Sequence, residues 1–318
     1  MSISINNAGI LTTVQDAGRN GYRRFGINTN GAMDRAAARL INILLGNSDT
    51  EAVLETHFPA PEMTFEEDAV FALGGADFRA KLNGEVLENW KPYYAENGSV
   101  LKFTGKLFGN RAYLSVKGGF IIEKWLGSAS TNLTANIGGF SGRKLNKGDK
   151  LLFKIQNLKF KIQNSTISNS LIPFYSRFPT VRVIAGAEFE SLTAFGEQSF
   201  RHQNFTVSQN SDRMGFRLSG EPLFLLEKKE LVSSAVNFGT IQLLPDGQLI
   251  ILMADAQTSG GYPRIAHIIE TDLPIVAQLG ASDRIAFQLI SIEEAENILM
   301  ELEVNLNFLR VACKFRQV

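Results

Sequence analysis

Apolar residues along the chain mostly form short runs that end in turns containing glycine. Residues 69–73 and 249–253 are such runs, and residues 113–117 alternate between apolar and polar side chains. Runs of this length, bounded by turn signals, predict β-strands. Asn-Gly or Asp-Gly pairs at 83–84, 97–98 and 246–247 predict hairpin turns, because these residues tolerate positive φ. The pattern predicts a mainly β fold, with curved sheets or barrels whose corners are tight.

Three segments depart from this pattern and predict helices. Residues 33–45 carry apolar side chains at helical spacing, and Gly46 follows them as a stop signal. Ser291 and Glu294 form a capping box ahead of another apolar stripe. A third, short helix is predicted after Asp272, because a proline follows two residues later, in its first turn. Helices this few are expected to cover the ends of barrels.

A polar stretch between residues 156 and 179 predicts a linker. It is rich in Asn, Ser and Thr between residues 163 and 170 and contains prolines at 173 and 179. We therefore expect an N-terminal β-barrel domain over residues 1–170, with the helix 33–45, and a C-terminal β-barrel domain over residues 171–318 that ends in a helix.

The composition excludes several classes of protein. The 318 residues are 44% apolar and 20% charged, and the formal net charge is zero. A neutral globular chain gives no electrostatic reason to expect nucleic acid or an anionic membrane as a partner. Cys313 is the only cysteine, so an intrachain disulfide and thiolate zinc sites are excluded. The start has no signal-peptide pattern and no apolar stretch is long enough to span a membrane, so we expect a cytoplasmic protein.

The common catalytic motifs are absent. The sequence contains no Gly-x4-Gly-Lys-Ser/Thr loop, no His-Glu-x2-His motif and no Gly-x-Ser-x-Gly motif. The three histidines, His57, His202 and His267, are far apart in sequence. Such histidines are more often structural than catalytic.

Two segments of the N-terminal half concentrate polar residues and glycines. Residues 12–35 lead into the predicted helix with Asp34 at its start, and a helix N-terminus can bind phosphate or carboxylate. The alternative is that Asp34 only complements the helix dipole. In the second segment, Ser128, Ser130 and Arg143 provide groups that can coordinate an oxyanion. A plain loop with Ser/Thr turns is the alternative there.

The third segment, residues 208–263, is the densest. The strand at 249–253 delivers Asp255, Gln257 and Thr258 to its end, and two glycines follow at 260 and 261. A carboxylate, an amide, a hydroxyl and an accessible backbone at one strand end often form a binding site. A turn without a ligand is the alternative.

These segments, in this order, resemble the allophanate hydrolase subunit 2 family. That family includes the C subunit of 5-oxoprolinase, the Kip-type antagonist of a kinase inhibitor, and one half of the carboxyltransferase domain of urea carboxylase. The resemblance covers roughly residues 5–295. It is carried by Asn30-Gly-Ala-Met-Asp-Arg35, Gly74-Gly-Ala-Asp77, Gly118-Gly119, Gly127-Ser128, Gly142-Arg143, Ser211-Asp-Arg-Met-Gly215 and Asp255-x-Gln-Thr-x-Gly-Gly-Tyr-Pro263.

The resemblance implies a fold and an activity. The fold is mainly β, with two cyclophilin-like β-barrel domains in tandem and a few helices. The activity is the ATP-dependent opening of 5-oxo-L-proline to L-glutamate, with ATP and Mg²⁺ as cofactors, in a complex with the A and B subunits of 5-oxoprolinase, the latter Kip-inhibitor-like. The chain is expected to be inactive alone. The alternatives are a non-enzymatic regulator that binds a Kip-type inhibitor, and a biotin-dependent carboxyltransferase component.

On this interpretation ATP phosphorylates the lactam carbonyl, and the protein mainly positions and neutralises charge. Arg213, Asp255 and Asp34 are then the catalytic candidates, with Arg213 and Arg143 as clamps for phosphate or carboxylate. The two aspartates would hold Mg²⁺ or orient the substrate, although no metal ligand is assigned. The remaining candidates for substrate or nucleotide binding are Gln257, Thr258, Gly260, Gly261, Tyr262, Ser128, Ser130 and Asp77.

The sequence departs from the family pattern at one place of chemical interest. Ser233-Ser-Ala-Val236 stands where the family typically has a Ser-Glu-containing motif, so an acidic group is missing there. The residue that transfers protons and the chain that binds ATP remain open at this point.

Overall fold

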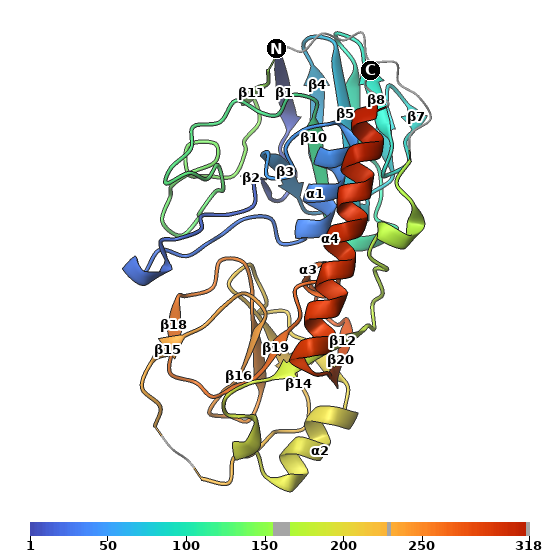
Figure 1. The fold of residues 1–318 in the computed structure, drawn as a ribbon. Coiled ribbons are helices and arrows are strands. Elements are labelled where there is room, and N and C mark those ends of the chain that lie inside the picture. The colour runs from blue at the N-terminus through green and yellow to red at the C-terminus, as the bar shows by residue number, and fades with distance from the viewer. Residues whose placement is uncertain (155–165, 228–229, 316–318) are drawn as a thin grey trace. The chain divides into compact units, whose positions relative to one another are not determined.

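A computed structural model describes residues 1–154, 166–227 and 230–315 (Figure 1). Within these ranges strands predominate and α-helices are few. The strands are β1 (Ser2–Asn7), β2 (Thr12–Gln15), β3 (Val53–Thr56), β4 (Glu62–Phe65), β5 (Ala69–Asp77), β6 (Ala80–Leu82), β7 (Glu85–Val86), β8 (Pro92–Ala95), β9 (Val100–Phe103), β10 (Phe108–Val116), β11 (Lys150–Leu152), β12 (Thr180–Ala185), β13 (Phe205–Val207), β14 (Gly215–Ser219), β15 (Ser234–Ala235), β16 (Thr240–Leu243), β17 (Leu249–Leu252), β18 (Ser259–Gly260), β19 (Arg264–Ile268) and β20 (Arg284–Leu289). The helices are α1 (Arg35–Leu44), α2 (Ala194–His202), α3 (Leu273–Ala277) and α4 (Ile292–Phe315), with short 3-10 turns at Arg23–Phe25, Asn169–Leu171 and Phe189–Ser191.

The chain divides into two compact units. The first consists of residues 1–19, 30–173 and 303–318, and the second of residues 20–29 and 174–302. Residues 20–29 therefore group with the second unit and residues 303–318 with the first, so neither unit is a continuous stretch such as 1–170 or 171–318. Part of the predicted linker, residues 156–165, lies outside the described residues. That 1–170 and 171–318 fold as separate domains stays a prediction.

In the first unit the strands form two antiparallel sheets. One has the order β11-β1-β4-β9-β6-β7 and the other β2-β3-β10-β5-β8. Their apolar faces share one core, to which the first sheet contributes Ile3, Phe65 and Leu101 and the second Phe71 and Leu114. The rings of Phe65 and Phe71 meet at a centroid distance of 5.0 Å. In this unit the described strands form two packed sheets, where a closed barrel was expected.

Helix α1 packs against β5 and β10 of the first unit. Asp34 is its N-cap, and its side chain accepts a hydrogen bond from the Ala37 amide. The strand below the helix has a glycine at 74, where a Cβ would lie 2.6 Å from the Trp90 ring and 2.7 Å from Ile41. The Gly74 position thus lets the helix approach the sheet, and the predicted helix 33–45 is confirmed.

In the second unit seven strands close into a barrel with the order β12-β19-β16-β17-β14-β13-β20. The β12–β20 pair is parallel, and the other pairs around the ring are antiparallel. A closed ring leaves no exposed strand edge. The predictions of a mainly β fold and of a barrel in the C-terminal half are confirmed.

Helix α2 lies beside β20 and covers the aromatic part of the barrel core (Figure 1). The Phe200 side chain of α2 is fully buried, and it stacks on Phe287 with a centroid distance of 5.1 Å and an interplanar angle of 7°. Phe189 and Phe205 complete the cluster at 5.7 and 6.4 Å from Phe200. The pattern of the sequence did not predict this helix.

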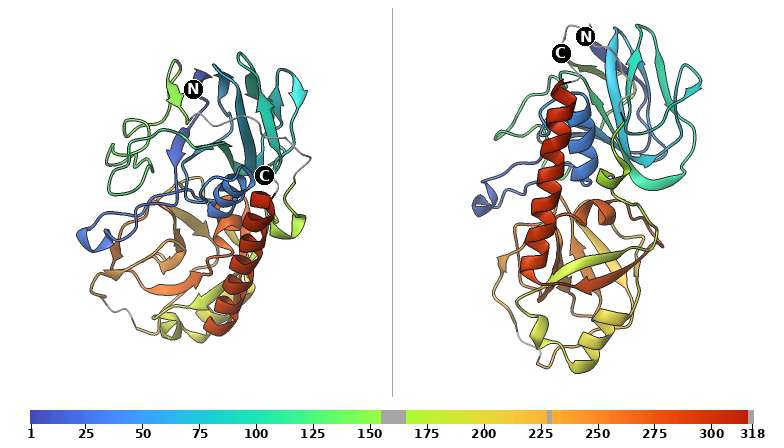
Figure 2. Two further views of the ribbon diagram at one scale, coloured as in Figure 1. Left: turned by 45° about the horizontal axis from the view of Figure 1, so that its top comes forward. Right: turned by 45° about the vertical axis from the view of Figure 1, so that its right-hand side comes forward.

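Helices α3 and α4 confirm the other two helix predictions. Pro274 lies in the first turn of α3. At the start of α4, the Glu294 carboxylate accepts from the Ser291 amide at 2.8 Å, and the Ser291 hydroxyl accepts from the Glu294 amide at 3.1 Å. Figure 2 shows α4 as one long helix. Within the described ranges, the helices are all too short or too polar to span a membrane.

The aromatic cluster predicts a large stability effect. Phe200→Ala should lower the free energy of unfolding by about 3–5 kcal/mol, because it leaves a cavity among packed rings. Phe195, on the same helix, is 54% exposed. Phe195→Ala should change stability by less than about 0.5 kcal/mol. Urea denaturation followed by circular dichroism measures both, and equal effects of the two substitutions would contradict the assigned packing.

Candidate functional site

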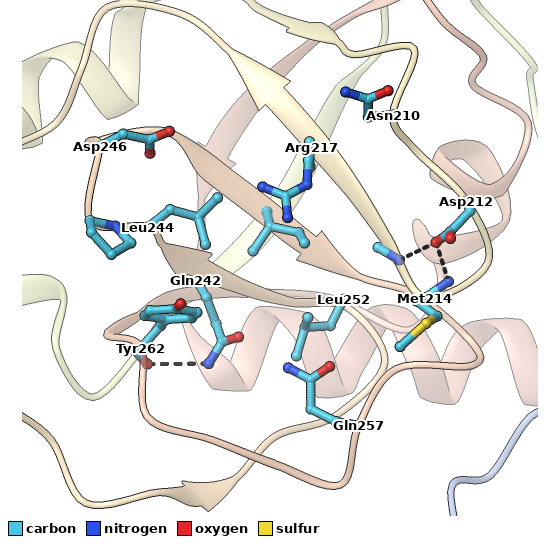
Figure 3. Close-up of a pocket in the computed structure, with 13 residues that line it drawn as sticks. Asn210, Asp212, Met214, Arg217, Gln242, Leu244, Asp246, Leu252, Gln257 and Tyr262 are labelled. Atoms are coloured by element: carbon cyan, nitrogen blue, oxygen red, sulfur yellow. Dashed lines mark hydrogen bonds between the residues drawn. The ribbon is translucent and has the colours of Figure 1, made fainter. Parts of the chain in front are cut away.

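A pocket of about 510 Å³ lies on the surface of the second unit (Figure 3). Its walls come from β14, β16, β17 and the segment that follows β17. It is lined by Asn210, Asp212, Met214, Gly215, Arg217, Gln242, Leu244, Pro245, Asp246, Ile250, Leu252, Gln257 and Tyr262.

Strand register places the polar wall of the pocket on the outer face of the barrel. Phe216 pairs with Ile251, which pairs with Ile241, and all three side chains are buried in the apolar interior. One residue along, Arg217, Ile250 and Gln242 form the next row. Because successive side chains of a strand point to opposite faces, this second row faces outward.

The outward-facing row places the Arg217 cation and the Gln242 amide on either side of an apolar pocket floor. Ile250 and Leu252 supply the floor. The Arg217 side chain is exposed, and within the described part of the chain its guanidinium makes no ion pair. Asp212, at the rim, accepts hydrogen bonds from the amides of Met214 and Gly215 at 2.8 and 3.2 Å (Figure 3). Arg217 is therefore the group of this pocket best suited to bind an anion.

Gln242 is the polar residue of the row that the fold buries completely, at 0% exposure. Its Nε2 donates to the Tyr262 carbonyl at 3.2 Å. Its Oε1 has no hydrogen-bond partner among the described residues. Buried acceptors without a partner are rare in folded proteins, because each one forfeits its hydration.

The segment after β17 holds the predicted site residues of the C-terminal half. Gln257 and Tyr262 line the pocket, Tyr262 with 45% of its surface exposed. The Thr258 carbonyl accepts from the Val236 amide at 3.2 Å, and Gly260 pairs with Ser234 in the two-stranded sheet β15–β18. A Cβ on Gly261 would lie 3.2 Å from the Leu231 carbonyl oxygen. The segment from Gln257 to Tyr262, here called the wall segment, therefore borders the pocket with its two ends, while its middle is held against residues 231–236.

Arg213 and Asp255 form a buried ion pair behind this wall segment. Arg213 is 6% and Asp255 8% exposed. Arg213 donates through Nε at 2.8 Å and through Nη2 at 3.0 Å to the two carboxylate oxygens of Asp255. The Asp255 amide also donates to the Arg213 carbonyl at 2.8 Å. The pair ties the loop before β14 to the loop after β17, and a role for either residue in catalysis stays a prediction.

The candidates in the first unit are likewise engaged within the protein. Asp34 caps α1, as described above. The hydroxyls of Ser128 and Ser130 donate to the same Asp16 oxygen, at 2.7 and 2.5 Å, and all three residues are buried. Their geometry is that of a buried network that anchors the loop of residues 128–131 to the end of β2.

Arg143 and Asp77 are half-buried residues of the first unit. Arg143 forms a two-pronged ion pair with Asp149 at 2.6 and 2.8 Å. Hydrogen bonding to Asp149 raises the pKa of the Arg143 guanidinium. Asp77 ends β5 and accepts from the Arg79 amide at 2.7 Å. Phosphate or substrate binding by these residues stays a prediction.

The three histidines differ in their burial and in their contacts. His267 lies on β19, with its Nδ1 3.1 Å from the Thr240 hydroxyl. Burial and the nearby Arg264 cation lower the pKa of His267, although Glu188 opposes this effect. His202 is exposed at the end of α2, and His57 is half-buried in the first unit.

The described residues form no cluster of metal-ligating side chains. Among them no three His, Cys, Asp or Glu side chains are grouped so as to hold a metal ion. The two candidate carboxylates already accept hydrogen bonds from protein donors, Asp34 from the Ala37 amide and Asp255 from the Arg213 guanidinium. No step of the reaction is therefore assigned to a metal on these residues.

Comparison with known proteins identifies the family. The description "Carboxyltransferase domain, subdomain A and B" matches residues 25–289. The chain belongs to this family. The resemblance found in the sequence motifs is thereby confirmed.

The chain is similar to two C subunits of 5-oxoprolinase and to a urea amidolyase. The chain is 38% identical to the C subunit of 5-oxoprolinase from Haemophilus influenzae over 298 residues, which is 94% of each chain. It is 37% identical to the C subunit of 5-oxoprolinase from Escherichia coli, over 92% of this chain and 93% of the relative. The crystal structure of the K. lactis urea amidolyase matches with a TM-score of 0.91 and 27% identity, over 97% of this chain and 20% of that one.

Sequence reasoning did not select two pocket residues, Arg217 and Gln242. Both lie inside apolar strands, between Phe216 and Leu218 and between Ile241 and Leu243. A lone polar residue within a strand is a signal for an outward-facing position. That the two positions share one row of the barrel depends on strand order and register, which only the folded chain reveals.

The buried ion pair predicts an asymmetric response to mutation. Asp255→Ala should destabilise the protein by about 3–5 kcal/mol, because it removes the two hydrogen bonds that the Asp255 carboxylate accepts from the buried Arg213 cation. The double variant Arg213→Met with Asp255→Leu should recover most of this loss, since apolar pairs of similar volume often replace such pairs. Urea denaturation tests this.

The exposed pair Arg201–Glu197 is the control for that measurement. Glu197→Ala should cost less than about 1 kcal/mol. If Asp255→Ala were equally mild, Arg213 and Asp255 would not form a buried pair in solution.

The lowered pKa of His267 predicts a pH dependence of stability. The unfolded chain, with a histidine pKa near 6.5, binds a proton at higher pH than the folded chain does. The free energy of unfolding should therefore fall as pH decreases below 6.5. His267→Gln should reduce this slope. Urea midpoints at several pH values, compared for the two proteins, test this, and identical slopes would exclude the assigned burial.

Proposed function

We propose that the chain is a subunit of an ATP-dependent 5-oxoprolinase, which opens 5-oxo-L-proline to L-glutamate together with the A and B subunits. The observation that carries this proposal is the similarity to two proteins named as the C subunit of 5-oxoprolinase, which extends over more than nine-tenths of each chain. A match of this extent leaves little of either chain to serve a different purpose.

The chemistry of the substrate explains the need for ATP. The carbonyl of a five-membered lactam is a poor electrophile, and transfer of the terminal phosphoryl group to its oxygen activates the carbon. ADP leaves in this transfer. Water then adds to the activated carbon, the C–N bond breaks and the nitrogen takes up a proton, which gives the acyl phosphate of glutamate. A second water hydrolyses this acyl phosphate to glutamate and phosphate. Such a sequence demands positioning and charge neutralisation more than covalent participation by the protein.

The pocket of the second unit offers groups that suit this substrate. Arg217 is an exposed cation for the carboxylate of 5-oxoproline. Ile250 and Leu252 offer an apolar surface for the two ring methylenes. Arg213, Asp255 and the wall segment hold the pocket in shape in this proposal.

Nucleotide binding is assigned to the assembled complex in this proposal. The sequence has no phosphate-binding loop of the Gly-x4-Gly-Lys-Ser/Thr type. Among the described residues no three His, Cys, Asp or Glu side chains are grouped around one metal position. ATP and Mg²⁺ would therefore bind with groups from another subunit, which agrees with a chain that is inactive alone.

A second candidate is a role in carboxyl transfer. It is favoured by the family description and by the structural similarity to the K. lactis urea amidolyase. The chain corresponds to only 20% of that protein, so its whole activity requires parts that this chain does not contain. Dependence on a biotin carrier would distinguish this candidate from the first.

The proposed function predicts that turnover requires this chain. Co-expression with the A and B subunits should give ATP hydrolysis that depends on 5-oxoproline and releases glutamate in proportion to the ATP consumed. Each activity should disappear when any one of the three proteins is omitted. A coupled ADP assay and glutamate quantification measure the two products.

Three other results would contradict this proposal. Full activity of the A and B subunits without this chain would exclude an essential role in turnover. Activity that requires urea, bicarbonate and a biotin carrier would support carboxyl transfer. Tight binding to the B subunit, without turnover of any of these substrates, would support a regulator.

A further inference from the structure

The amide of Gln242 presents an unusual group to the pocket. It is completely buried, and its oxygen has no partner among the described residues. An acceptor in this condition stabilises any ligand that brings a matching donor, because the cost of its desolvation has already been met by folding.

The orientation of this amide is determined by its neighbours. Nε2 donates to the Tyr262 carbonyl, and the reverse orientation would place two acceptor oxygens against each other. Gly260 adjoins the same nitrogen, since a Cβ at this position would lie 2.9 Å from it. The wall segment therefore holds Nε2, and Oε1 is left as the interacting atom of Gln242.

An exposed side chain lies beside this amide. Gln257 is exposed, and its Nε2 lies 3.6 Å from the same hypothetical Cβ on Gly260. Figure 3 shows the amide nitrogen of Gln257 turned toward Gln242. No hydrogen bond joins the two amides in the described structure. A rotation of this exposed side chain gives a ligand access to Oε1.

The distance between the acceptor and the cation suits a small ligand with two functions. Gln242 and Arg217 share the row on either side of Ile250, so their backbones are about 10 Å apart, or two strand spacings. Both residues line the pocket between these strands. A small ligand with a donor next to an anionic group can therefore lie between the two side chains in this pocket.

We propose that Gln242 Oε1 accepts the ring N–H of a γ-lactam whose adjacent carboxylate is bound by Arg217. In 5-oxoproline the N–H and the carboxylate are on neighbouring atoms, which matches an acceptor and a cation that face one pocket. Gln242 is then a specificity-determining residue that selects a cyclic amide over the isosteric lactone, whose ring oxygen cannot donate. This inference rests on the proposed function.

The test compares the wild type with Gln242→Met, each with two ligands, in the complex of all three subunits. The ligands are 5-oxoproline and the corresponding lactone, 5-oxotetrahydrofuran-2-carboxylate, and the readouts are KM for the lactam and the inhibition constant of the lactone. Gln242→Met should raise KM for the lactam about 10- to 100-fold, the effect of losing one buried hydrogen bond. It should change the inhibition constant of the lactone less than about 3-fold, since the lactone never made that bond.

Two further variants complete the test, one as a matched control and one as a second probe of the Gln242 amide. Gln288→Met makes the same change on an exposed position of β20, outside the pocket, and should leave both constants unchanged. Gly260→Ala keeps the Gln242 amide but displaces it, because the added Cβ would lie 2.9 Å from Nε2. It should raise KM for the lactam in the same direction, even if Gln242→Met fails to fold.

The outcomes separate the inference from the function on which it rests. If the wild-type complex neither binds nor opens 5-oxoproline, the proposed function and this inference both fail. If the wild type is active but Gln242→Met weakens lactam and lactone equally, Gln242 only supports the pocket and the inference alone fails. If Gln242→Met and Gly260→Ala fold and leave both constants unchanged, Oε1 does not contact the substrate.

Discussion

Closure of the seven-stranded barrel constrains every other feature of the second unit. Each strand is hydrogen-bonded on both sides, so the register of one strand determines which side chains of all its neighbours face inward. Phe216, Ile241 and Ile251 fill the interior, and Arg217, Ile250 and Gln242 must then face outward. The pocket follows from this row once the segment after β17 folds over it.

Several arginines of this unit are held in ion pairs with carboxylates, whereas Arg217 faces the pocket. Arg182, Arg213 and Arg264 each form two-pronged pairs with a carboxylate, Asp272, Asp255 and Glu188 respectively. These pairs join the ends of strands to the connecting loops, and such charges are costly to separate where they are buried. Arg217 differs because it faces the pocket, which makes it the cation with which a small anion can interact.

The sequence predicted the elements whose signals are local. Helices α1, α3 and α4 have stop, proline or capping signals within a few residues, and all three form. Helix α2 has an N-cap, Thr193, but it has no comparable apolar stripe and contains Gly196, so its formation depends largely on its contact with the barrel core. The closed ring in one unit and the paired sheets in the other depend on strand order, which short runs of residues do not encode.

The candidate site shows the same division. Composition indicated Arg143 and Ser128 as groups for an oxyanion, but it could not show that Asp149 and Asp16 already interact with them. Residues 257–262 were selected because they follow a strand, a local property, and two of them do line the pocket. Gln242 became visible only when its burial and the missing partner of its oxygen were known, and both are properties of the folded chain.

Helix α4 has a consequence for the order in which the protein matures. Its residues from 303 onward belong to the first unit, where Glu303 binds Arg39 at 2.6 Å and Arg310 binds Asp49 at 2.5 Å. A ribosome synthesises these residues after the whole of the second unit. The first unit therefore begins to emerge first but acquires its ion pairs with α4 only after the second unit has been synthesised. Until then, Arg39 and Asp49 lack their α4 partners and can pair only with each other, as they do in the folded unit at 3.2 Å.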